Sequence, residues 1–240
     1  MTHSPTAPRP VQIEEGVHRQ TLAWEGEPAL ELELRWPRLP EQTPALRRIN
    51  RYYRKTVQQW RERWQTDLLR QAGVSLQAAR QASRPFTPWR AELTWRVTWQ
   101  GDGLLSLYAD AVEQTPGRRP FTVRRGDTWE LASGTPCTLP SLFPPHTLWR
   151  RQILAAVEKQ IRAALAAGES SFYEGWEKRL ATCFDPDRFY LTEDQICVFY
   201  PLFSIAPFAE GIPCFSLPRP DRPAGEIAKK TDKNLEKKSF

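Results

Sequence analysis

The sequence predicts an α+β protein in which two to three amphipathic helices pack on a mainly antiparallel sheet. Several segments alternate apolar and polar residues with a period of two, and turn-forming residues join them into pairs, as in β-hairpins. Two longer segments repeat apolar residues at three- and four-residue steps, which is the spacing of an amphipathic helix. Because the strand segments come in pairs, their order argues against a sheet of regular βαβ units.

The composition indicates a folded protein with a sizeable core. The chain has 240 residues, of which 40% are apolar, and it includes ten Trp and eleven Phe. A chain of this length can build its core without disulfides or a metal. We expect one domain over residues 11–218, a flexible N-terminus over 1–10 and a flexible basic tail over 219–240.

Residues 11–36 predict two strands joined near the sequence Glu-Gly-Glu-Pro at 25–28. In the second strand, apolar residues alternate with charged ones, which predicts one buried and one solvated face. The apolar positions of this strand are Leu30, Leu32, Leu34 and Trp36.

A helix follows, because Thr43 can cap its N-terminus and Pro44 suits its first position. Apolar residues then recur at helical spacing until Gly73, where we expect the helix to end. These apolar residues are Leu46, Ile49, Tyr53, Val57, Trp60, Trp64 and Leu68.

Residues 91–112 predict a second hairpin, with its turn at Gly101-Asp102-Gly103. Alternation in its first strand predicts that four apolar residues share one face: Leu93, Trp95, Val97 and Trp99. Short strands are expected at 121–123 and at 128–131.

A second helix is predicted from about Thr147 to Gly168, and a short third helix is predicted after it. The second helix should bury Trp149, Ile153, Val157, Ile161 and Leu165. The third helix is indicated by the spacing of Phe172, Trp176 and Leu180.

The stretch from Phe189 to Pro218 predicts a hairpin, a bend and a returning strand. The hairpin turn falls at 192–195, and the strand after it is apolar on both faces, which favours a central position in a sheet. Three prolines, Pro201, Pro207 and Pro213, cannot donate to a strand ladder and should lie at strand ends, bulges or an edge. Gly211 can adopt a positive φ and so allows a sharp turn.

The run Ile205–Pro213, between Phe189–Asp194 and Phe215–Pro218, resembles the C-terminal signature of the RsiV-like domain family. Members of that family occur in lysozyme-responsive anti-sigma factors and beside some peptidoglycan deacetylases. The order of elements over 11–218 is also similar to that of the whole RsiV-like module. The resemblance implies a noncatalytic binding or sensing module for a protein or an envelope-derived ligand. Within the signature, the expected binding residues are Tyr200, Phe203, Pro207, Phe208, Glu210 and Gly211.

One loop departs from the RsiV-like pattern. Many relatives carry a Gly-Gly-Ala-His-Gly-like loop after the central hairpin, whereas this chain has Gln-Thr-Pro-Gly-Arg-Arg-Pro at 114–120. Ligand contacts that depend on the loop of the relatives are therefore not carried over to this chain.

Charge offers an alternative function, the binding of nucleic acid or another anionic polymer. The net charge is +6, and five of the eight lysines lie in the last twelve residues. The first predicted helix also has an arginine-rich face, on which the candidate anion-binding residues are Arg47, Arg51, Arg54 and Arg61. Salt dependence separates the two functions, because binding driven by phosphate weakens steeply as salt rises.

The sequence lacks the signatures of the common enzyme and metal sites. Only His3, His18 and His146 are histidines, and there is no GxSxG, HExxH, Walker or GxGxxG motif. The four cysteines form no CxxC pair, so we expect no metal, no cofactor and no enzymatic activity. Cys197 and Cys214 could face each other on neighbouring strands, but buried free thiols are the state we expect.

No segment is apolar over the length needed to cross a bilayer, and residues 1–10 lack the apolar stretch of a signal peptide. As written, the sequence therefore predicts a cytoplasmic protein. Because the better-known relatives work outside the cytoplasmic membrane, we expect an extracytoplasmic location if the N-terminus is incomplete.

We predict that this protein does not bind animal-type lysozyme tightly. This chain is basic, as those lysozymes usually are, so long-range repulsion slows their encounter, and the loop at 114–120 differs from that of the relatives. Calorimetry at low and at physiological salt should find no submicromolar affinity. Submicromolar binding at either salt concentration would show that the two departures matter little.

Overall fold

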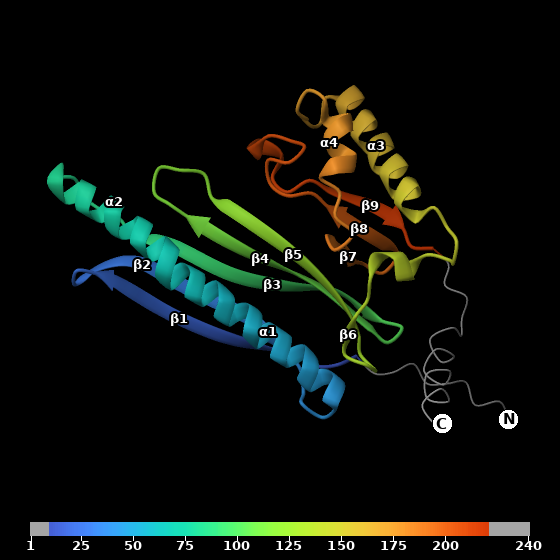
Figure 1. Ribbon diagram of the computed structural model, residues 1–240, viewed down its shortest axis with the longest axis horizontal. Helices are drawn as coiled ribbons and strands as arrows, with labels where there is room; N and C mark the ends of the chain where they lie inside the picture. Colours follow the sequence, from blue (N-terminus) through green and yellow to red (C-terminus); the bar gives the residue numbers. More distant parts are fainter. Residues whose placement is uncertain (1–9, 221–240) are drawn as a thin grey trace, which may run out of the picture.

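The computed structural model describes residues 10–220, which form a six-stranded sheet, a three-stranded sheet and the helices that cover them (Figure 1). The six-stranded sheet contains β1 (Glu14–Trp24), β2 (Glu27–Arg38), β3 (Trp89–Gly101), β4 (Leu104–Gln114), β5 (Phe121–Glu130) and β6 (Thr135–Pro136), in that order. The three-stranded sheet contains β7 (Phe189–Leu191), β8 (Gln195–Phe199) and β9 (Cys214–Pro218). All neighbouring strands are antiparallel except β2 and β3, which confirms the predicted α+β class.

One long helical segment covers β2 and its neighbours on one face of the large sheet (Figure 1). It consists of α1 (Pro44–Arg63), a π-helical turn (Trp64–Leu68) and α2 (Leu69–Gln81). The predicted cap is confirmed, since the backbone N–H of Leu46 donates to Thr43 Oγ1 over 3.2 Å. The predicted end at Gly73 is wrong, because Gly73 lies buried inside α2. The ring of Trp24 occupies the space that a Cβ would need, so this glycine permits close packing and does not stop the helix.

A buried carboxylate fastens α1 to the large sheet. Tyr52 donates to Asp127 Oδ1 over 2.8 Å, and Trp129 Nε1 donates to the hydroxyl of Tyr53 over 2.7 Å. Burial raises the pKa of Asp127, while the Arg125 guanidinium and the two tyrosine hydroxyls act in the opposite direction. These bonds join the middle of α1 to β5 and so fix the helix along the sheet.

The central hairpin of β3 and β4 is confirmed, but its apolar residues do not all share one face. The β3–β4 register shifts between Val97 and Trp99, so Trp99 is paired with Ser106. A bulge of this kind sends the following side chain to the opposite face. Leu93 and Val97 accordingly pack under the helices, whereas Trp99 packs against the other core.

Three further differences from the expected elements concern β5, α3 (Trp149–Ala167) and α4 (Trp176–Thr182). The two short strands expected at 121–131 form the single strand β5, because β4 pairs with it along its whole length. Leu165 is 40% exposed, since its turn of α3 extends beyond the core that buries Ile161. Phe172 precedes α4 and does not belong to it.

The small sheet packs on the face of the large sheet that the helices leave open. In β4, Ser106 alternates with Leu105 and Leu107, which belong to the helix-side core. Ser106 Oγ accepts from the backbone N–H of Leu191 over 2.7 Å and lies 2.9 Å from Thr128 Oγ1. Ser106 and Thr128 are both buried. The hydroxyl of Ser106 therefore provides an acceptor for a backbone N–H at the open edge of β7 that water cannot reach.

A glycine permits this close approach of the two sheets. A Cβ at Gly126 in β5 would overlap the backbone carbonyl of Phe189 in β7. On its other face, the small sheet packs with α3 and α4 around a second core that contains Ile153, Val157 and Val198. Gln160 of α3 donates to the carbonyl of Ser216 over 2.9 Å and so covers the outer edge of β9.

We predict that Gly126→Ala lowers the free energy of unfolding by about 1–3 kcal/mol, because the added methyl group meets backbone that can move only if the two sheets separate. Urea denaturation measures the loss. Gly101→Ala is the matched control, since there the methyl group meets the side chain of Trp99, which can adjust, and a smaller loss is expected. Equal losses for the two variants would contradict the proposed role of Gly126.

Candidate functional site

The bend between β8 and β9, residues 200–213, contains the binding residues that the sequence suggested. Its base is closed by a hydrogen bond from the N–H of Tyr200 to the carbonyl of Pro213 over 2.9 Å. The hydroxyl and the N–H of Ser204 both donate to the carbonyl of Pro201. The three prolines lie outside β8 and β9, as predicted, and β8 is the central strand with its apolar residues buried on both faces.

The bend is anchored in the second core. Ile205 and Ala206 are fully buried. Tyr200 is 1% exposed, and its hydroxyl donates to the carbonyl of Leu180 over 3.1 Å. Burial raises the pKa of Tyr200. Of the predicted binding residues, Tyr200 therefore lies in the core, where it holds the bend in place.

The segment between α3 and α4 supports the bend from its outer side. The N–H of Tyr173 donates to the carbonyl of Ile205 over 3.0 Å, and the N–H of Ser171 donates to Glu210 Oε1 over 2.8 Å. Glu210, a predicted binding residue, thus has a backbone partner within the fold. These bonds make the bend an ordered loop.

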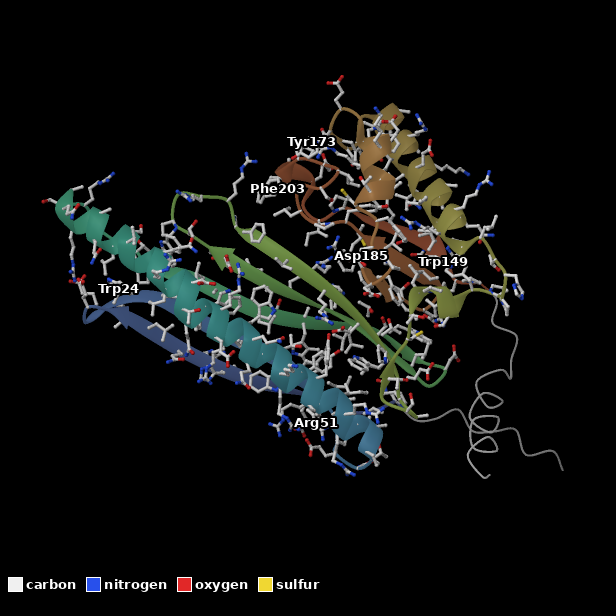
Figure 2. The ribbon with its side chains drawn as sticks, viewed as in Figure 1. Trp24, Arg51, Trp149, Tyr173, Asp185 and Phe203 are labelled. Atoms are coloured by element: carbon white, nitrogen blue, oxygen red, sulfur yellow. The ribbon has the colours of Figure 1, made fainter. Side chains whose placement is uncertain are left out.

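Phe203 is the most unusual residue of this loop. Its φ is 64°, in the left-handed region that bulky residues rarely adopt, and 45% of it is exposed. Its ring stacks on that of Phe208, with 5.9 Å between centroids and 30° between planes. In Figure 2, Phe203 and Tyr173 are labelled at the same end of the molecule. The unfavourable backbone conformation presents a pair of aromatic rings at the surface.

Two arginines extend this aromatic pair into a larger surface. Arg119, in the loop between β4 and β5, places its guanidinium 5.0 Å from the ring centroid of Phe208. Arg179 of α4 lies 5.3 Å from the ring of Tyr173 and donates to the carbonyl of Ser204. We call these five residues, Phe203, Phe208, Tyr173, Arg119 and Arg179, the aromatic loop surface.

The sequence pointed to Phe203 and Phe208 but missed the other three residues of this surface. Arg119 lies in the loop 114–120, which was noted only for its departure from the RsiV-like pattern. The loop contains two successive arginines together with Pro and Gly, and this pattern could have identified Arg119 as a candidate binding residue.

The alternative anion-binding residues all lie on the exposed side of α1. Two of them already have a partner in Glu41. Arg47 donates to the backbone carbonyl of Glu41, and Arg54 forms an ion pair with the Glu41 carboxylate at 3.0 Å. The hydrogen bond from Arg54 is the main cause of the lowered pKa of Glu41. Arg51 and Arg61 are exposed, so an anionic ligand would depend mainly on these two residues.

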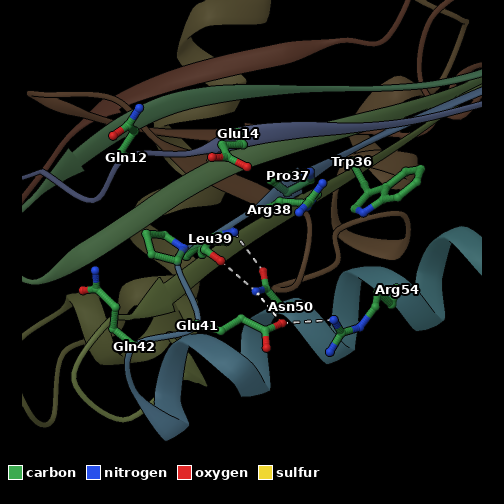
Figure 3. Close-up of a pocket in the computed structure, with 11 residues that line it drawn as sticks. Gln12, Glu14, Trp36, Pro37, Arg38, Leu39, Glu41, Gln42, Asn50 and Arg54 are labelled. Carbon is green, nitrogen blue, oxygen red and sulfur yellow. Dashed lines mark hydrogen bonds and ion pairs between the residues drawn. The ribbon is translucent and has the colours of Figure 1, made fainter.

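A pocket of about 580 Å³ lies beside this helix, between the end of β2 and the start of α1 (Figure 3). Asn50 holds its floor, because its side chain accepts from the N–H of Leu39 and donates to the carbonyl of the same residue. The walls carry both signs of charge, from Glu14, Glu41, Arg38 and Arg54. This mixture does not favour an anion over a cation.

The two thiols singled out by the sequence lie on neighbouring strands of the small sheet. Both are free; Cys197 is buried, whereas Cys214 is exposed and so differs from the expected buried thiol. Tyr190 Oη lies 3.3 Å from Cys214 Sγ, and the neighbouring Cys214 thiol lowers the pKa of Cys197. No cluster of three or more metal-binding side chains occurs within residues 10–220.

Comparisons with known proteins concern mainly the C-terminal part and the fold. Residues 140–220 match the family described as a protein of unknown function, DUF3298. This range contains α3, α4, the small sheet and the bend at 200–213. No curated protein matches the chain.

Two solved structures show the same fold over most of the chain. A DUF3298 family member from Bacteroides fragilis has a TM-score of 0.64 at 14% identity, over 87% of this chain and 90% of that chain. A DUF3298 family protein from Pseudomonas aeruginosa has a TM-score of 0.55 at 16% identity, over 88% and 91% of the two chains. At these identities the likeness concerns the fold. The likeness to the RsiV-like module in particular stays a prediction.

We predict that Gly211→Val lowers the free energy of unfolding by about 1–3 kcal/mol. Gly211 has φ 66° and ψ −141°, a region essentially restricted to glycine, and open space surrounds its Cβ position, so the cost arises from the backbone. Chemical denaturation measures the effect. Ala209→Val, at an exposed position in the same bend, is the control and should change stability little. Wild-type stability of the Gly211 variant would contradict this account of the bend.

Proposed function

We propose that this protein is a noncatalytic binding module that recognises a partner protein through the aromatic loop surface. The observation that supports this most directly is Phe203, which keeps a bulky ring exposed in a left-handed conformation. Such strain persists only where the surrounding structure enforces it, and it is concentrated at ligand-binding and active sites.

The chemistry of the surface favours a protein ligand. Aromatic rings and arginine are the groups most enriched at the energetic centres of protein interfaces. Phe203 and Phe208 supply apolar area, and Arg119 and Arg179 supply charged groups beside it. An envelope-derived ligand, which the RsiV-like resemblance also allows, is a distinct outcome of the test.

The ordered backbone supports the same proposal. Bonds from Tyr173 and Ser171 hold the bend, and Tyr200 anchors it in the core. A surface that is ordered before binding loses little conformational freedom when a partner docks.

The exposed groups of this surface suit binding better than catalysis. Aromatic rings and guanidinium groups make contacts, whereas a guanidinium keeps its proton at neutral pH and cannot serve as a general base. The proposal of a module without enzymatic activity therefore rests on the kind of groups that the surface presents.

Photo-crosslinking tests the proposal. A benzoylphenylalanine residue at position 203 should crosslink one partner protein in the native host, whereas the same residue at position 51 on α1 should not. The purified partner should then bind the wild-type protein, and Phe203→Ala should weaken this binding by about 2 kcal/mol, as expected for an aromatic residue at the centre of an interface.

The matched control is Arg51→Ala, which removes an exposed arginine of α1 and should leave partner binding unchanged. Titration with heparin and with duplex DNA covers the alternative function. If Arg51→Ala weakens binding of either polymer while Phe203→Ala has no effect on any ligand, the proposal is wrong and anionic-polymer binding is favoured. Crosslinks from position 203 only to glycan material would favour an envelope-derived ligand.

A further inference from the structure

The outer edge of β1 is a long strand edge with no strand paired to it among residues 10–220. β1 is the terminal strand of the large sheet, and its eleven residues pair with β2 alone. In Figure 1 it lies at the border of the sheet, beyond β2 and the helices. Every second backbone N–H and C=O along such a strand points outward and can accept another strand.

Of the features by which proteins usually prevent pairing at an edge, the strand has charged side chains, but these are of both signs. It contains no proline and no lysine, and its bulge lies at Leu22 and Ala23, near one end. The two edges of the small sheet are better covered. Ser106 accepts a hydrogen bond from a backbone N–H of β7, and Gln160 donates one to a backbone carbonyl of β9.

The side chains of β1 are self-complementary in one antiparallel register. Glu15, Val17 and Arg19 are exposed on the face opposite the helices. If two copies pair about a two-fold axis at Val17, each Glu15 lies opposite Arg19 of the other copy, and the two valines meet at the axis. Shifting the axis to Arg19 would place two guanidinium groups opposite each other, which is unfavourable.

This register also continues an ion-pair chain that exists within one copy. Glu15 binds Arg35 at 3.0 Å, Arg35 binds Glu33 at 2.7 Å, and Glu33 binds Arg19 at 2.8 Å. Both ends of the chain, Glu15 and Arg19, lie on β1. If two copies pair at Val17, Glu15 of each copy lies opposite Arg19 of the other copy. The two series of ion pairs then join into one ring in which the charges alternate.

We infer that β1 is a homodimer interface, in which two copies pair antiparallel about Val17 over residues 14–20 and join their large sheets into one. The sheet faces are preserved across the axis, so the helices of both copies lie on the same side. Seven paired residues make a small contact, and we expect a weak, concentration-dependent dimer.

Sedimentation equilibrium of the full chain at low salt tests the inference. Between roughly 1 µM and 1 mM, the mass should rise from 27.8 kDa towards twice that value. Val17→Lys places two ammonium groups at the axis and should weaken dimerisation at least about tenfold. Ala23→Lys is the matched control, because this exposed residue of β1 lies outside the paired segment and should leave the dimer unchanged.

A charge exchange tests the register itself. Glu15→Arg and Arg19→Glu should each weaken the dimer, and the double variant should dimerise more tightly than either single variant. Circular dichroism and thermal unfolding of each variant confirm that the monomer stays folded. A monomer throughout the concentration range, a dimer insensitive to Val17→Lys, or a double variant as weak as the single variants would overturn the inference.

Discussion

The contact between the two sheets determines where every part of the aromatic loop surface lies. The bend at 200–213 belongs to the small sheet, whereas Arg119 belongs to a loop of the large one. The two sheets meet where Gly126 exposes its backbone to Phe189 and where Ser106 accepts from Leu191. Without this close approach, the ring of Phe208 and the guanidinium of Arg119 would belong to separate surfaces. A glycine and a serine within two strands of the large sheet thus position a surface that neither of them contacts.

Local patterns in the sequence predicted most of the elements, because each hairpin and helix has its own period and its own end signals. Thr43, the turn at 101–103 and the alternation in 189–199 are examples in which neighbouring residues decide the structure. The predictions were wrong where contacts with a distant segment of the chain determine the local structure. Gly73 resembles a helix stop until Trp24 packs against it, and the bulge before Trp99 leaves the alternation of residue types unchanged. The fold class and the buried faces of β2 and β8 were therefore accessible from the sequence, whereas the face on which Trp99 lies was not.

The candidate site was predictable only in part, for the same reason. The prolines and Gly211 identified the bend, and its exposed rings followed from it. An isolated sequence does not tell whether a ring such as that of Tyr200 faces solvent or the core, and the structure places it in the core. Arg119, Tyr173 and Arg179 come from two other segments of the chain. Their contribution depends on the tertiary arrangement and leaves little trace in local spacing.

Because of the bulge in β3, the large sheet contributes side chains to the core under the helices and to the core of the small sheet. Before the bulge, Leu93 and Val97 pack under the helices; after it, Trp99 joins Leu104 in the core of the small sheet. The segment that matches DUF3298, residues 140–220, therefore obtains part of its own interior from strands that precede it in the chain. Excised alone, that segment would expose the apolar side of β7 and lose the partner of the Leu191 amide. The boundary drawn by sequence similarity therefore cuts through a core that residues on both sides of it share.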